Sequence, residues 1–198
     1  MPERKIQFRQ GCYYHLYNQG AGRQSIIREE KNYHYLLELI NKHLAELQLT
    51  LIAYCLMPNH YHWLVRQDSD NAAGLLAQRV FNSYTRAFNN AYSRTGTLFA
   101  GRYKAILVSS DEYLRHLCCY IHANPVKDGF ALAPELWPYS NYQEWIGMRN
   151  GKLVDRALVA QYFPIPGSYQ QYVLDYCAHR TKLPKGLQAY IAELEAMA

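Results

Sequence analysis

Two histidines separated by one residue, His60 and His62, are the sharpest chemical feature of this sequence. Side chains at positions i and i+2 of a β-strand lie on one face, with their Cα atoms roughly 6.6 Å apart. Two imidazoles at that spacing can bind one divalent metal ion, provided that a third ligand completes the site. The alternative is structural, with two partly exposed histidines on an edge strand.

A tyrosine and an asparagine lie four residues apart, at Tyr120 and Asn124. On one helix they would share a face, where a phenol hydroxyl and an amide oxygen can approach the same metal ion and phosphate group. Pro125 disfavours helical geometry at Asn124, which predicts that the asparagine lies at the helix end. Among nineteen tyrosines, spacing alone does not single out Tyr120. The alternatives include Tyr84, Tyr103 and Tyr113.

The elements that would position these residues follow from hydrophobic periodicity. Residues 12–19 are rich in β-favouring aromatic side chains and predict a strand. Apolar residues at three- and four-residue spacing predict amphipathic helices over residues 29–49 and 72–92. A short apolar run from Lys104 predicts a further strand.

The two histidines fall in the second arm of a predicted antiparallel hairpin. Its strands are residues 50–57 and 60–66, joined by the turn-forming pair Pro58-Asn59. Tyr61 and Trp63 alternate with the histidines, so they should point to the opposite face, where helices cover the sheet. The strand would therefore separate a polar site from an apolar core.

The spacing of Ser109 and Glu112 fits a capping box, which predicts a helix from there to about Ala123, stopped by Asn124-Pro125. The element order is then strand, helix, strand, strand, helix, strand, helix. This order predicts an α+β fold, a ferredoxin-like split βαβ antiparallel sheet with an added helix.

The chain divides, on this interpretation, into residues 1–129, the domain that contains both candidate pairs, and residues 130–198, a C-terminal extension packed on the core. The extension contains prolines, two tryptophans and turn signals. Weak helical patterns occur in it over residues 154–162 and 170–179.

The composition is that of a globular protein with a basic balance. Hydrophobic residues make up 49% and charged residues 19%, and the formal net charge is +5, which favours a polyanionic partner such as nucleic acid. Five cysteines without a Cys-x-x-Cys pair fit a reducing compartment. No apolar run reaches membrane-spanning length and the N-terminus lacks the pattern of a signal peptide, so we expect a cytoplasmic protein with no membrane partner.

Three ordered motifs carry a resemblance to a known family: MPNHYHWLV, then GRYK, then YLRHLCCYIHANPVKDG. Together they resemble the Y1 transposases, which act on single-stranded DNA with a His-hydrophobic-His (HUH) motif and one catalytic tyrosine. The similarity is greatest to their REP-associated tyrosine transposases. It covers roughly residues 12–147, including the segment WPYSNYQEWIG.

This resemblance implies a role for each residue of the two pairs. His60 and His62 would bind a catalytic Mg²⁺ or Mn²⁺, Tyr120 would be the nucleophile, and Asn124 would be the third metal ligand. The asparagine replaces the glutamine of related insertion-sequence enzymes. Attack by the tyrosine would form a 5′-phosphotyrosine bond and release a 3′-OH, and the reverse reaction would rejoin DNA. His122 should point elsewhere on the helix and is interpreted as structural.

The partner implied by the resemblance is single-stranded DNA with a REP-like hairpin and a short tetranucleotide at its foot, processed at the bacterial nucleoid by a monomer or homodimer. Basic and aromatic residues occur together in the middle of the chain, where they could contact phosphates and stack unpaired bases. An ordinary helix with a solvated basic face is the alternative. The predicted DNA-binding residues are Arg79, Arg86, Arg102, Tyr103 and Lys104, with Tyr84, Phe88 and Tyr92 as possible stacking partners.

Two other classes of function remain open. The chain could be a domesticated, non-cleaving protein that binds hairpin DNA or RNA, although the joint presence of the four site residues favours activity. It could instead be a metal-dependent hydrolase that releases a free 5′-phosphate. A covalent protein–DNA adduct that survives denaturation distinguishes the transposase from both.

Overall fold

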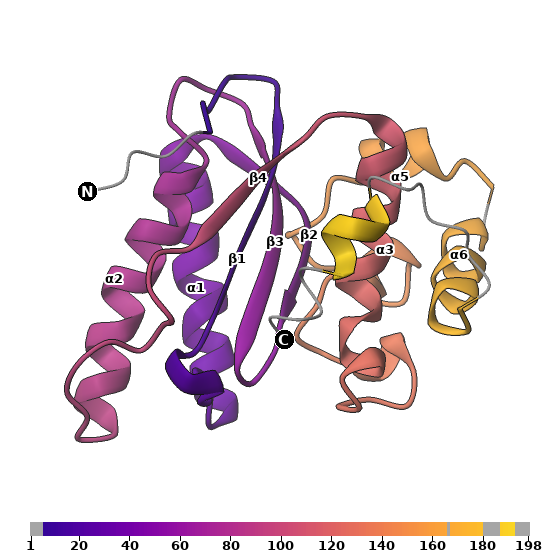
Figure 1. Ribbon diagram of the computed structural model, residues 1–198. Coiled ribbons are helices and arrows are strands. Elements are labelled where there is room, and N and C mark those ends of the chain that lie inside the picture. The colour runs from indigo at the N-terminus through magenta and orange to yellow at the C-terminus, as the bar shows by residue number, and fades with distance from the viewer. Residues whose placement is uncertain (1–5, 166, 180–186, 193–198) are drawn as a thin grey trace. The chain divides into compact units, whose positions relative to one another are not determined.

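The computed structural model describes residues 6–165, 167–179 and 187–192 (Figure 1). The chain forms two compact units, which are treated in turn. The first comprises Met1–Leu51 and Met57–Val108, and the second comprises Ile52–Leu56 and Ser109–Ala198. The division of domains expected after residue 129 stays a prediction.

A four-stranded antiparallel sheet has the strand order β2-β3-β1-β4. Strand β1 pairs with both β3 and β4, and Tyr17 lies opposite His62 on one side and opposite Lys104 on the other. This order confirms the ferredoxin-like split βαβ arrangement. The strands are β1 (Tyr13–Gln19), β2 (Leu49–Leu56), β3 (His60–Gln67) and β4 (Lys104–Val108).

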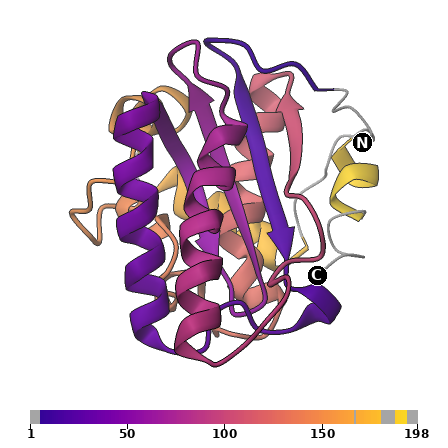
Figure 2. The same cartoon turned by 90° about the vertical axis from the view of Figure 1, so that its left-hand side faces the viewer.

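Two long helices, α1 (Glu30–Leu47) and α2 (Gly74–Ala91), lie side by side on one face of the sheet in the first unit (Figure 2). Tyr61 and Trp63 point to this face, where their ring centroids lie 4.5 and 5.0 Å from that of Phe81 on α2. The prediction that these rings face the helices, opposite to the histidines, is therefore confirmed.

Helix α1 lies within two residues of its predicted range, because local signals mark both of its ends. Asn32 Oδ1 accepts a hydrogen bond from the backbone N–H of Glu29 at 3.2 Å and so completes a capping box. At the other end Gln48 adopts a left-handed conformation, with φ at 51°, which stops the helix. A short 3₁₀ turn, η1 (Ala21–Arg23), follows β1.

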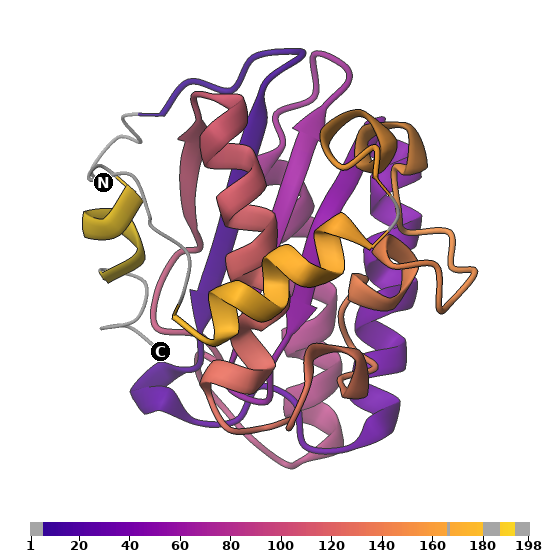
Figure 3. The ribbon, with the colours of Figure 1, turned by 90° about the vertical axis from the view of Figure 1, so that its right-hand side faces the viewer.

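The second unit is mainly helical, and α6 packs across α3 (Figure 3). The weak helical patterns predicted over residues 154–162 and 170–179 correspond to α5 and α6. No helix in the described ranges is both long and apolar enough to cross a membrane. The elements are α3 (Asp111–Lys127), η2 (Pro134–Leu136), α4 (Tyr142–Trp145), α5 (Arg156–Tyr162) and α6 (Ser168–Cys177).

Helix α3 differs from its prediction at both ends. Ser110, and not Ser109, is the N-cap, and its hydroxyl accepts a hydrogen bond from the backbone N–H of Tyr113 at 3.2 Å. The helix also continues past Pro125 to Lys127, so the expected stop at Asn124 is wrong. A proline this near the C-terminus removes one helical hydrogen bond, while the backbone N–H of Asp128 still donates to the carbonyl of Asn124 at 2.9 Å.

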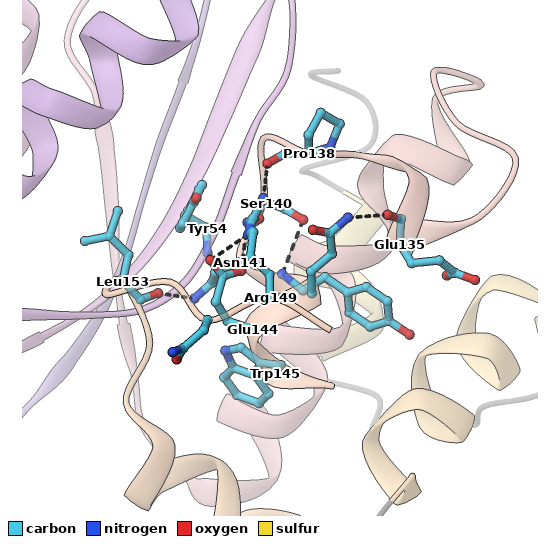
Figure 4. Close-up of polar contacts among 12 residues, drawn as sticks. Tyr54, Glu135, Pro138, Ser140, Asn141, Glu144, Trp145, Arg149 and Leu153 are labelled. Atoms are coloured by element: carbon cyan, nitrogen blue, oxygen red, sulfur yellow. Dashed lines mark hydrogen bonds and ion pairs between the residues drawn. The ribbon is translucent and has the colours of Figure 1, made fainter. Parts of the chain in front are cut away.

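Asn141 connects separate segments of the second unit through four hydrogen bonds. Figure 4 shows its contacts with Tyr54 and Leu153. Its amide nitrogen donates to the carbonyls of Ile52 and Leu153 at 2.8 and 2.9 Å. Its amide oxygen accepts from the backbone N–H of Tyr54 and from His122 Nε2, both at 2.8 Å. The side chain thus connects part of β2, α3 and the loop after α4, and gives the WPYSNYQEWIG segment a structural role.

Candidate functional site

His60 and His62 lie on one face of β3, with ring centroids 5.1 Å apart and planes at 75°. Both side chains are buried, at 3% exposure. His60 Nδ1 lies 2.9 Å from Asn59 Oδ1. Because an amide oxygen can only accept, Nδ1 must carry the hydrogen, and Nε2 then carries the lone pair. This tautomer is the one in which Nε2 can bind a metal ion.

His15 is a residue of this site that sequence reasoning missed. It lies on β1 and is completely buried, and its Nε2 is 3.0 Å from His62 Nδ1. Burial lowers the pKa of His15 to about 3, so its imidazole is neutral near pH 7 and can accept a hydrogen bond. If His62 Nδ1–H donates to His15, then His62 Nε2 carries the lone pair. Metal-binding histidines commonly have such a partner on their second nitrogen.

On the same face of the sheet, the side chains beside His62 lead to the positively charged Lys104. His15 also stacks on Tyr17, with ring centroids 4.7 Å apart. Tyr17 lies between His62 and Lys104 in the strand register, and Lys104 Nζ is 6.0 Å from the Tyr17 ring centroid. Neighbouring strands are ~4.8 Å apart, so Lys104 is roughly 10 Å from the His62 position on the same face. Lys104 therefore places a positive charge on the same face as the histidines, two strands away.

The tyrosine and the asparagine occupy consecutive turns of α3, as their spacing predicted. Tyr120 and Asn124 are buried, at 1% and 2% exposure. Asn124 lies inside the helix, and its Nδ2 donates to the Tyr120 carbonyl at 2.9 Å. The amide nitrogen is therefore engaged by the backbone, while the oxygen is the atom that a metal ion would bind. Lys127 Nζ lies 5.0 Å from the Tyr120 ring centroid, one further turn along α3.

The structure places the four residues in two pairs, His60 with His62 in the first unit and Tyr120 with Asn124 in the second. Within the described ranges, no three His, Cys, Asp or Glu side chains form a group that could hold a metal ion. The expected ligand set contains two imidazoles and one amide, so it is not a group of three His, Cys, Asp or Glu side chains.

The five predicted DNA-binding residues lie in different surroundings. Arg86, Arg102 and Tyr103 line one open groove, which has a volume of about 920 Å³. Arg79 lies outside it, with Nη1 3.6 Å from a carboxylate oxygen of Glu46. Lys104 belongs to the row of side chains beside the histidines.

Two of the aromatic residues considered for base stacking belong to the core instead. Tyr84 and Phe88 are 1% and 2% exposed, and the Tyr84 hydroxyl donates to the Ile26 carbonyl at 2.6 Å. The stacking interpretation is therefore wrong for both residues. The reason is the helical period, which turns them toward the protein interior on α2.

His122 has the structural role that was expected. It is completely buried, with Nδ1 2.5 Å from the Tyr169 hydroxyl and Nε2 2.8 Å from Asn141 Oδ1. Burial lowers its pKa to about 4, so the ring is neutral, donating from Nε2 to the amide and accepting at Nδ1 from the phenol.

A histidine pair on a sheet strand and a helix that carries a buried tyrosine agree with a DNA-processing class of enzyme. The family model of IS200-like transposases matches residues 8–124, which include both pairs. The chain therefore belongs to the IS200-like transposase family.

The relatives bear out the expected resemblance to the REP-associated subgroup. A curated protein of Haemophilus influenzae, named as a REP-associated tyrosine transposase, is 27% identical over 60% of this chain and 77% of its own length. The fold is similar to the structure of a REP-associated tyrosine transposase bound to a REP hairpin, with a TM-score of 0.63. That match has 18% identity and covers 79% of this chain and 98% of the other.

Proposed function

We propose that this protein is a metal-dependent transposase that cleaves and rejoins single-stranded DNA beside a REP-type hairpin, through a covalent bond between Tyr120 and a 5′-phosphate. The observation that carries the proposal is the histidine pair on β3, in which each Nδ1 has a hydrogen-bonding partner, Asn59 for His60 and His15 for His62. That arrangement supports the tautomer of each ring in which Nε2 could bind a metal ion.

The donor set suits a catalytic Mg²⁺ or Mn²⁺. His60, His62 and the amide oxygen of Asn124 would hold the ion, and none of the three ligands adds negative charge. Imidazole nitrogen favours Mn²⁺ over Mg²⁺, because it is a softer donor than oxygen. When bound, the metal ion supplies positive charge that offsets the charge developing on the phosphate oxygens.

The reaction needs one nucleophile and conserves the energy of the DNA backbone. The Tyr120 oxygen bonds to phosphorus while the bond from phosphorus to the 3′-oxygen breaks, and the phenol proton is balanced by the proton of the new 3′-OH. The reverse attack by a 3′-OH rejoins DNA and restores the phenol. The positive charge of Lys127, 5.0 Å from the ring centroid, supports negative charge on the Tyr120 oxygen in both directions.

The substrate proposal rests on charge and on the relatives. The chain has a net charge of +5. Arg86 and Arg102 line the open groove, and Lys104 lies on the same face of the sheet as His62. A similar structure holds a REP hairpin, which suggests the same kind of partner for this protein. As an enzyme of DNA, it would act in the cytoplasm at the bacterial nucleoid, as a monomer or a homodimer.

The test is the formation of a covalent adduct. Labelled hairpin DNA with a single-stranded flank is incubated with the protein and Mn²⁺, denatured and separated by electrophoresis. Wild-type protein should give a shifted band that Tyr120→Phe lacks, because that change removes only the attacking oxygen, whereas Tyr113→Phe on the same helix should retain it. His60→Ala, His62→Ala and EDTA should each abolish the band, and Asn124→Ala should weaken it less.

Other results of this assay would identify one of the two alternative classes of function. Cleavage that leaves a free 5′-phosphate and no adduct would identify a hydrolase. Hairpin binding without any cleavage in Mn²⁺ or Mg²⁺ would identify a non-cleaving binding protein. A band that persists in Tyr120→Phe would mean that another tyrosine is the nucleophile.

A further inference from the structure

Residues of α2 and of the segment 97–103 line an open groove. That segment leads into β4 (Figure 2). Its volume of about 920 Å³ is in the upper part of the ~300–1,000 Å³ range of ligand sites. The described residues that line it all belong to the first unit.

Aromatic rings form a rigid part of its lining. The rings of Phe81 and Phe99 meet at 64° with centroids 4.5 Å apart. Phe81 is held from behind by Trp63, whose plane is 7° from parallel at a centroid distance of 5.0 Å. Phe81 and Phe99 are 8% and 9% exposed, so a ligand could contact only a small part of each ring. Because packing already fixes both rings, that contact would cost little side-chain entropy.

The wall opposite α2 is also held in place. The Leu98 carbonyl accepts from the backbone N–H of Ala21 at 3.0 Å, and the Gly101 carbonyl accepts from Asn18 Nδ2 at 3.1 Å. At the end of the segment Tyr103 packs so closely on the start of α2 that a Cβ at Gly74 would collide with its hydroxyl. The groove is therefore preformed.

Polar side chains follow one stripe of α2 along the groove. Gln78, Asn82 and Arg86 are spaced by four residues and are all exposed. Each amide has both donors and acceptors, so it can form hydrogen bonds with the edge of a nucleobase. A guanidinium can bind phosphate or stack on a base. Among the described residues that line the groove, none is acidic.

We propose that this groove binds one unpaired nucleotide of the DNA substrate and reads its base, with the base edge against Gln78 and Asn82 and the ring beside the exposed parts of Phe81 and Phe99. The inference rests on the proposed action on single-stranded DNA. An unpaired nucleotide is the occupant because only an unstacked base exposes its face and its edge together. The arginines Arg86 and Arg102 supply the matching charge for its phosphates.

The experiment uses full-length Tyr120→Phe protein and a hairpin that carries a single-stranded flank with 2-aminopurine at one flank position at a time. Binding should change the 2-aminopurine emission at one position, because the base leaves its neighbours for the groove. In Gln78→Ala and Asn82→Ala that change should be largely lost, and the preference for one base there should fall by about tenfold. Asn90→Ala, an exposed asparagine on α2 outside the lining, should behave as the parent.

A further variant tests whether the DNA occupies the groove. Thr85→Trp places a large ring in the groove and should weaken binding of the flanked hairpin, while a blunt hairpin without a flank should bind equally well to both proteins. Equal loss on both DNAs, or an emission that the groove variants leave unchanged, would overturn the inference. Tight, groove-dependent binding of free dAMP with no effect of the variants on the flanked hairpin would assign a small-molecule site instead.

These experiments distinguish a failure of the nucleotide site from a failure of the proposed cleavage. With Tyr120 restored, the groove variants should still form the covalent adduct at saturating DNA. If wild-type protein forms no adduct while the flank still binds through Gln78 and Asn82, cleavage is refuted and the nucleotide site stands. If adduct forms without any base preference that depends on the groove, the site is refuted and the cleavage stands.

Discussion

At the residue scale, the proposed chemistry depends on which imidazole nitrogen carries a hydrogen. His60 and His62 each hold a partner at Nδ1, and the two partners differ in kind. Asn59 Oδ1 can only accept, whereas His15 Nε2 accepts only in one tautomer. A metal ion on His62 would select that tautomer, so His15 acts as a positioning residue for the site.

Replacing His15 should therefore change metal affinity directly. His15→Leu removes the acceptor, and we expect the affinity for Mn²⁺ to fall by about 10- to 100-fold. The measurement is titration of free Mn²⁺ by electron paramagnetic resonance in the absence of DNA. His15→Gln, which keeps an acceptor oxygen, should recover part of the affinity.

The control for that experiment is a histidine away from the site. His43 bonds through Nδ1 to Glu46 at 2.8 Å on α1, so His43→Leu should leave Mn²⁺ affinity unchanged. Unchanged affinity in a folded His15→Leu protein would remove His15 from the proposed site.

The buried His122 predicts how stability depends on pH. Its pKa is about 4 in the folded protein and ~6.5 in the unfolded chain, so the unfolded state binds the proton more readily. Stability from this group is present above about pH 6.5 and declines as the pH falls toward 4, by up to ~1.4 kcal/mol per pH unit. Urea denaturation at pH 7, 6, 5 and 4.5 measures it. His122→Gln should be less stable at pH 7 and should show a shallower decline, and an equal slope in both proteins would contradict this assignment.

At the element scale, α3 carries the proposed nucleophile and is held by buried polar contacts. Its middle is connected through His122 to Asn141 and Tyr169, and its start is capped by Ser110. Its end continues through Pro125, which keeps Asn124 one helical turn from Tyr120. The spacing of the two proposed site residues is thus set by a regular helix.

Removing the central amide of this arrangement should destabilise the protein strongly. Asn141→Ala removes the acceptor of the buried backbone N–H of Tyr54 and of His122 Nε2, which should cost about 3 kcal/mol. The free energy of unfolding in urea measures this cost. Asn90→Ala, on the exposed side of α2, should change it by less than about 0.5 kcal/mol. A similar small change for Asn141→Ala would show that the contacts contribute little.

At the scale of the whole molecule, the net charge of +5 makes association with DNA sensitive to salt. We expect a single-stranded or hairpin DNA to bind better than a blunt duplex, because stacking requires unpaired bases. Affinity should fall as salt concentration rises, since phosphate contacts release counterions.

Arg102 tests this expectation at one position. Arg102→Ala should weaken binding to all sequences and reduce the salt slope by about one unit if the guanidinium contacts one phosphate. Fluorescence anisotropy between low and moderate salt measures the slope. Arg79→Ala is the matched control, because Arg79 pairs with Glu46 outside the groove and should have the smaller effect. Equal slopes for Arg102→Ala and wild type would remove Arg102 from the DNA contacts.

Much of the architecture was already determined by local sequence. The alternation along β3 placed His60 and His62 on the face opposite Tyr61 and Trp63, because a strand has a period of two. The helical period likewise defined α1 and α2 to within two residues. It also explains the core position of Tyr84 and Phe88, against the stacking role considered for them. These features depend on neighbours a few residues apart.

The tertiary structure decided which distant side chains meet. His15 contacts His62 only through the register of β1 with β3, the groove forms only where segment 97–103 returns beside α2, and Asn141 finds partners on three separate segments. Local periodicity predicts the face on which a residue lies but contains no information about the register between elements. That register is set by packing and hydrogen bonds between residues far apart in the chain, which is why these contacts could not be predicted from the sequence alone.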